Sequence, residues 1–124
     1  MGKRRWNRFL FVWTAAILLA GVRRRAVSWD AVLADIDEMA NNPAAAAMSD
    51  PDAYLEAGAE AHQALLEGGE ETAAILLDEL EASGASGLRE YLMAAVCAEI
   101  TGVGCDGGWS TAAEWVALYR ASQA

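Results

Sequence analysis

The sequence predicts an all-α fold, and three observations lead to this prediction. Alanine is abundant along the 124-residue chain, whereas valine, isoleucine and aromatic residues are scattered. Proline occurs only twice, at Pro43 and Pro51. No segment alternates apolar and polar residues as a half-buried strand would, while apolar residues recur at helical spacing from Ser28 onward. The expected fold is an N-terminal hydrophobic helix followed by a small bundle of antiparallel helical hairpins, with about five helices in the bundle.

The N-terminal segment, residues 1–25, is an apolar stretch with basic residues on both sides. Residues 9–22 are apolar or small throughout, and as a helix they would span about 21 Å, against about 30 Å for the hydrocarbon core of a bilayer. Because this stretch shows no polar stripe, we expect it to enter the membrane rather than lie on its surface. Its large apolar residues are Phe9, Leu10, Phe11, Val12, Trp13, Ile17, Leu18, Leu19 and Val22.

Two interpretations of this segment stay open. Its length and the basic residues before it are typical of an export signal peptide. However, the run Arg23-Arg24-Arg25 follows directly, and no good Ala-x-Ala cleavage site precedes it. We therefore expect a short uncleaved anchor, since a bilayer can thin and arginines can reach its surface. We expect the rest of the chain to lie outside the cytoplasmic membrane, in a periplasmic or other extracytoplasmic space. A body that faces the cytoplasm is the alternative for an uncleaved anchor.

The two signs of charge are segregated along the chain. The first 25 residues hold seven basic residues and no acid, whereas residues 26–124 hold all eighteen acids and only Arg89 and Arg120, a net charge of −16. Such an acidic body repels phosphate backbones, which argues against binding of nucleic acid. A basic protein partner fits this charge, and so does the simpler interpretation that the acids keep an alanine-rich domain soluble.

Residues 26–50 are expected to form a first amphipathic helix and a linker. The helix should begin at Ser28 as N-cap, end near Ala40 and carry an apolar face of Trp29, Val32, Leu33, Ile36 and Met39. The helix stops at Asn41-Asn42-Pro43.

Residues 51–124 are expected to form the helical-hairpin domain. A helix begins at Asp50-Pro51 and ends at Gly68-Gly69, and a second covers residues 70–82 up to Gly84. Ser86 should cap the next helix, which reaches about Thr101 and precedes a glycine-rich loop at residues 102–108. Thr111 and Glu114 form a capping box that opens the last helix. Trp29 and Trp115 are both expected in the core.

Two stretches of this domain resemble known helical repeats. The segment from Leu65 to Ala73 is similar to the turn between the two helices of a tetratricopeptide repeat, with Gly68 five residues before a packing alanine. Residues 88–119 resemble Sel-like repeats, with matching features at Gly102, Val103, Asp106, Ala112 or Ala113, and Trp115. The resemblance covers about residues 52–121. It implies a tetratricopeptide-like fold that binds another protein on a helical surface.

A catalytic or metal-binding constellation is not recognisable in the sequence. His62 is the only histidine, and neither a catalytic triad nor a histidine-based metal site can be built around it from neighbouring residues. A second carboxylate facing His62 across a cleft would instead indicate an enzyme. We therefore predict no catalytic residues, no metal, no cofactor and no enzymatic activity.

Three further residues are candidates for special roles. Cys97 and Cys105 lie eight positions apart around a glycine turn, close enough for a disulfide in an exported protein, although two reduced thiols remain the alternative. Trp109 stands in the glycine-rich loop, where it either covers the helix ends or contacts a partner.

Two functions are compatible with these observations. The first is a non-enzymatic, membrane-tethered adaptor or accessory subunit that binds another protein through a helical surface. The second is a small structural subunit of a larger membrane protein complex, in which the short apolar helix, residues 9–22, packs against other transmembrane helices.

Overall fold

The computed structural model describes residues 27–46 and 50–124, and the regular structure in these ranges is entirely helical. The all-α prediction is therefore confirmed for this part of the chain. The described helices are α2 (Trp29–Ala40), α3 (Asp52–Ala57), α4 (Ala59–Glu67), α5 (Gly69–Ser83), α6 (Leu88–Thr101) and α7 (Ala112–Gln123).

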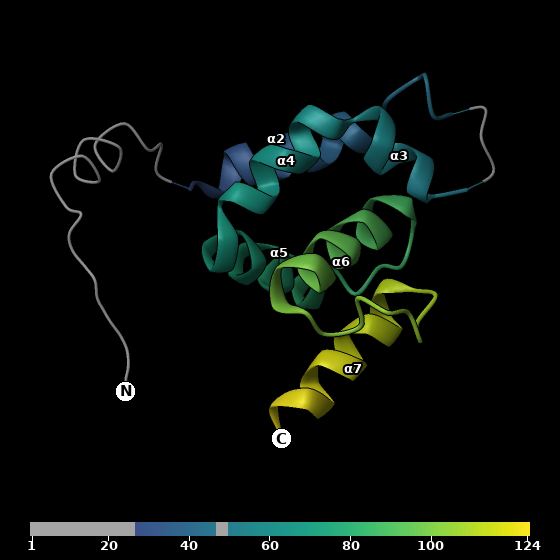
Figure 1. Ribbon diagram of the computed structural model, residues 1–124. Coiled ribbons are helices and arrows are strands. Elements are labelled where there is room, and N and C mark those ends of the chain that lie inside the picture. The colour runs from purple at the N-terminus through teal and green to yellow at the C-terminus, as the bar shows by residue number, and fades with distance from the viewer. Residues whose placement is uncertain (1–26, 47–49) are drawn as a thin grey trace, which may run out of the picture.

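Helix α6 is the centre of the arrangement. Helices α2 and α4 pack on one side of it and α7 on the other (Figure 1). Helix α5 precedes α6 in the chain, is joined to it by a short turn and packs beside it. All seven residues from Leu92 to Ala98 are buried, so this stretch is covered on every side rather than along one stripe. Helix α6 is therefore the core of the fold.

The surrounding helices each contribute a narrow apolar stripe to this core. The buried side chains are Val32, Ile36 and Met39 of α2, Ala61 and Leu65 of α4, Ala73, Leu76 and Leu80 of α5, and Ala112 and Trp115 of α7. Since α2 belongs to the same core as the helices after residue 50, residues 27–46 and 50–124 fold around one common interior.

Most of the helix ends lie where local hydrogen bonding was expected to place them. The Ser28 hydroxyl oxygen accepts a hydrogen bond from the Ala31 amide at 3.1 Å and caps α2. At the start of α7 the Thr111 hydroxyl oxygen accepts from the Glu114 amide at 3.2 Å, while the Glu114 carboxylate accepts from the Thr111 amide. Helix α5 ends at Gly84, whose φ of 65° is the left-handed conformation that glycine favours.

The single helix expected between Pro51 and Glu67 is wrong, because the structure divides it at Gly58 into α3 and α4. Gly58 is buried, and a Cβ atom at this position would lie 2.8 Å from Cγ of Met39 and 3.4 Å from its Cα. The break therefore lets the chain pass close to the buried end of α2. A contact between residues this far apart in sequence leaves no trace in the helical periodicity.

Two smaller expectations also need correction. Trp29 is 43% exposed, because it occupies the first position of α2, one turn before the first buried residue, Val32. Helix α6 is capped at Gly87 rather than Ser86, and the Gly87 amide donates to the Glu90 carboxylate at 3.0 Å.

The predicted membrane segment, residues 9–22, lies outside the described residues. Within the ranges that are described, no helix is both long and apolar enough to cross a bilayer. Anchoring by the N-terminal segment therefore remains a prediction from sequence.

Replacement of Gly58 by alanine should destabilise the protein by about 1–3 kcal/mol, because the new methyl group would overlap the fully buried Met39 side chain. The free energy of unfolding from urea denaturation measures this effect. In a Met39→Ala background the same substitution should cost less, since the overlapping atoms are gone. A Gly58→Ala variant as stable as the wild type would show that the close approach of α2 and α4 does not constrain this position.

Candidate functional site

The principal candidate site is a groove of about 550 Å³ between α5, α6 and α7, which we call the α5–α7 groove. Helix α5 forms one wall with residues spaced at helical intervals, namely Glu70, Ala73, Ala74, Leu77 and Asp78. Ala74 and the two acids are exposed, Leu77 is half-buried, and Ala73 lies against the core. The middle of this wall therefore consists of apolar, mostly small side chains, and Glu70 and Asp78 make the wall acidic at two points along its length.

Helix α7 forms the opposite wall, which is aromatic. The rings of Trp115 and Tyr119 stack with centroids 5.3 Å apart and an angle of 23° between their planes. The Trp115 indole nitrogen donates to the Val103 carbonyl oxygen at 2.8 Å, so the ring is held in a fixed orientation. Gln123 extends this wall by a further turn. Because Trp115 is buried, the aromatic surface that this wall offers to the groove is that of the half-buried Tyr119, which the stacked indole supports.

The floor of the groove comes from the end of α6 and the loop that follows. Cys97, Ile100, Thr101 and Val103 line it. The Thr101 hydroxyl donates to the Cys97 carbonyl oxygen at 2.8 Å, which turns this polar group back toward its own helix. The apolar part of the floor is the half-buried Ile100 and Val103, while Thr101 is exposed.

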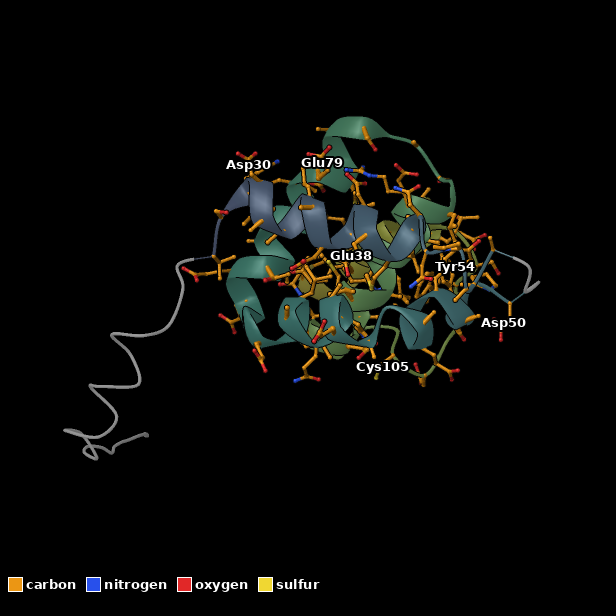
Figure 2. All side chains as sticks on the ribbon, turned by 90° about the horizontal axis from the view of Figure 1, so that it is seen from above. Asp30, Glu38, Asp50, Tyr54, Glu79 and Cys105 are labelled. Carbon is orange, nitrogen blue, oxygen red and sulfur yellow. The ribbon has the colours of Figure 1, made fainter. Side chains whose placement is uncertain are left out.

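Acidic side chains are also spread over the surface away from this groove. Figure 2 shows Asp30 and Glu38 on α2 and Asp50 beyond it, at the outside of the fold. The two arginines of the described ranges are already paired: Arg89 Nε lies 2.7 Å from Asp37 Oδ1, and Arg120 pairs with Glu81. Most of the negative charge is consequently left without a basic neighbour.

A second cavity of about 530 Å³ lies between the start of α2, the end of α4 and the first turn of α5. It is lined by Val27 and Val32, by the buried Thr72, and by the acids Asp35, Glu67 and Glu71, among others. Within residues 27–46 and 50–124, no group of three or more histidine, cysteine, aspartate or glutamate side chains could hold a metal ion.

His62 does meet a carboxylate in the structure. Its Nε2 lies 2.9 Å from Glu99 Oε2, and the pair joins α4 to α6 across 37 positions of sequence. Neither residue lines the two cavities just described. Among the described residues, this pair does not belong to any group of three or more side chains that could hold a metal ion.

The two cysteines are free thiols in the structure and have different surroundings. Cys97 is completely buried, and its Sγ lies 3.8 Å from the Ala73 carbonyl oxygen. Burial raises the pKa of the Cys97 thiol to about 12. Cys105 is exposed at the edge of the fold (Figure 2), so the disulfide expected from the sequence is not formed here.

Trp109 folds back onto its own loop. Its indole nitrogen donates to the Gly104 carbonyl oxygen at 2.8 Å, and its ring lies 5.2 Å from that of Tyr91. Tyr91 in turn donates to Asp52 Oδ1 at 3.2 Å; burial raises the pKa of this tyrosine, and the nearby Asp52 carboxylate adds to the effect. Trp109 therefore ties the glycine-rich loop to α6. A contact of Trp109 with a partner protein remains a prediction.

No protein-family model, curated protein or solved structure matches this chain. The features of the described structure that bear on function are therefore the α5–α7 groove and its charge.

The sequence alone did not reveal the α5–α7 groove. The helical spacing of Ala73 with Leu77, and of Trp115 with Tyr119, fits burial in a core as well as it fits a groove wall. Ala74 is the residue that could have indicated the groove from the sequence. A second small residue beside Ala73 leaves a space next to α5 that a larger side chain would fill.

The two cysteines should differ sharply in reactivity at pH 8. Because the thiolate is the nucleophile and the Cys97 pKa of about 12 keeps that group protonated, a thiol reagent should modify Cys105 alone in the native protein. Both should react after denaturation without reductant, and a Cys105→Ser variant should lose the rapid phase. If neither thiol reacts in the denatured, unreduced protein, the disulfide expected from the sequence is formed instead.

The Asp37–Arg89 pair should contribute measurably to the contact between α2 and α6. A double-mutant cycle with Asp37→Asn and Arg89→Gln should give a coupling energy of about 0.5–1 kcal/mol, since both side chains are partly exposed. Urea denaturation is the suitable measurement, because guanidinium chloride would screen the charges. Strictly additive single substitutions would show that the pair adds nothing to stability.

Proposed function

We propose that this chain is a non-enzymatic, membrane-tethered adaptor or accessory subunit that binds another protein in the α5–α7 groove. One observation carries the proposal: three helices align an apolar floor, a low alanine wall and a stacked tryptophan–tyrosine wall along one groove. Tryptophan and tyrosine are the residues that most often dominate the binding energy of protein interfaces.

The rigidity of the aromatic wall supports this assignment. Trp115 is almost completely buried, 1% exposed, and its indole is fixed by the hydrogen bond to Val103. Trp115 therefore supports the ring of Tyr119, and a ring already held in one orientation loses little conformational entropy when a partner covers it. Tyr119, half-buried beside it, still has surface to lose on binding.

Other support for the proposal comes from sequence. The basic-flanked apolar segment, residues 9–22, would tether the protein and place its acidic body in an extracytoplasmic space. The resemblance of residues 52–121 to tetratricopeptide-like and Sel-like repeats points to protein binding on a helical surface. A structural subunit of a larger membrane complex would share this topology, but it would bind through the membrane segment instead of the groove.

Detergent extraction with groove variants tests the proposal. Ala74→Gln should fill the groove without changing net charge, because Ala74 is exposed on its wall. Partners that copurify with the wild-type chain should be depleted at least about tenfold from this variant, as expected for loss of roughly 1.4 kcal/mol of binding.

The matched control is Ala82→Gln, which places the same substitution at an exposed position of α5 outside the groove. This variant should retain its partners. A stoichiometric complex that survives detergent extraction and is unaffected by Ala74→Gln would favour the structural subunit. A chain that has no partner sensitive to Ala74→Gln would refute the proposal.

A further inference from the structure

The α5–α7 groove has two acidic residues, and both lie on its α5 wall. Glu70 and Asp78 lie eight residues apart on α5, which is about 12 Å along a helix axis, and both are exposed. The apolar residues Ala74 and Leu77 lie between them. The lining contains no lysine, arginine or histidine, so the groove offers a partner one sign of charge only.

Within the described residues, no basic side chain neutralises the charges of Glu70 and Asp78. Arg89 is held by Asp37 and Glu90, and Arg120 is held by Glu81. Neither Glu70 nor Asp78 takes part in an ion pair in residues 27–46 and 50–124. A ligand with positive charges at matching positions would therefore gain two ion pairs without breaking any existing ones.

The walls of the groove restrict the backbone conformation of a ligand. Both walls are helices, whose main-chain amide and carbonyl groups are already bonded within α5 and α7. An extended peptide would find no sheet edge to pair with, and its own backbone groups would lose water without compensation. A helical ligand satisfies these groups internally, and it presents side chains at the spacing that the groove walls also have.

We propose that the α5–α7 groove receives an amphipathic helix of another protein, with an apolar stripe and lysine or arginine residues flanking it. The stripe packs on Leu77, Ile100 and the ring of Tyr119, while the basic residues pair with Glu70 and Asp78. The net charge of −16 on residues 26–124 adds a long-range attraction that speeds the encounter. This inference rests on the proposed function and specifies the chemistry of the partner.

Binding of designed peptides to the full chain in uncharged detergent tests the inference. The probe is a helical peptide of 15 residues, the length of α5, with leucine and alanine at i, i+3, i+4 and i+7 and lysine beside this stripe. A second peptide carries glutamate in place of lysine. Isothermal titration calorimetry should show binding of the lysine peptide at least about tenfold tighter than that of the glutamate peptide.

Charge-neutralising variants locate the interaction. The double substitution Glu70→Gln and Asp78→Asn should weaken the lysine peptide roughly fivefold, because two partly exposed ion pairs are lost. The matched control is Asp30→Asn with Glu38→Gln, which removes the same charge from exposed positions on α2 (Figure 2). This control should change the affinity by less than about twofold, since it alters only the long-range field.

Several results would overturn the inference. They are equal binding of both peptides, no binding of either, an equal loss of affinity in the α2 control, and self-association of the chain that Ala74→Gln abolishes. The inference and the proposed function can fail separately. If copurified partners are lost in Ala74→Gln but the lysine peptide shows no preference, the adaptor function stands and the basic helix is refuted. If no partner depends on Ala74, the proposed function fails, whatever the peptides do.

Discussion

The burial of α6 is the constraint on which the rest of the described structure depends. A helix without a solvent-facing side between Leu92 and Ala98 must be covered from several directions at once. Helices α2, α4, α5 and α7 supply this cover. Because alanine and cysteine occupy four of these seven positions, the neighbouring helices can approach closely and pack at the density of a protein interior.

The groove follows from the same packing. Helices α5 and α7 both rest on α6, and the small side chains of Ala73 and Ala74 face the large rings of Trp115 and Tyr119. Short side chains on one wall leave a space that the opposite rings line but do not fill. The hydrogen bond from Trp115 to Val103 prevents the ring from turning into this space. An open groove is therefore compatible with a well-packed core directly beneath it.

Charge has two roles in this fold. The few ion pairs connect elements far apart in sequence, as Arg89 does when it joins α6 to Asp37 of α2. The remaining acids cover the surface and repel one another, which favours solubility at some cost to stability. In the α5–α7 groove this unneutralised charge lies beside apolar surface, and this combination is what gives the proposed partner its amphipathic, basic character.

The sequence by itself determined the helical class and most of the helix ends. The caps at Ser28, at Thr111 with Glu114 and at Gly84 depend on groups within four residues of one another, so local chemistry specifies them. The sequence also determined the segregation of charge between residues 1–25 and the acidic body.

Only the tertiary structure decided the features that join distant residues. These are the break at Gly58 against Met39, the exposure of Trp29, the pairing of His62 with Glu99, and the groove itself. Helical periodicity shows which residues of a helix are apolar, but it carries no information about which neighbouring helix covers them. Whether Leu77 and Tyr119 belong to a closed core or to a groove wall depends on the side chains opposite them, and the fold alone brings those together.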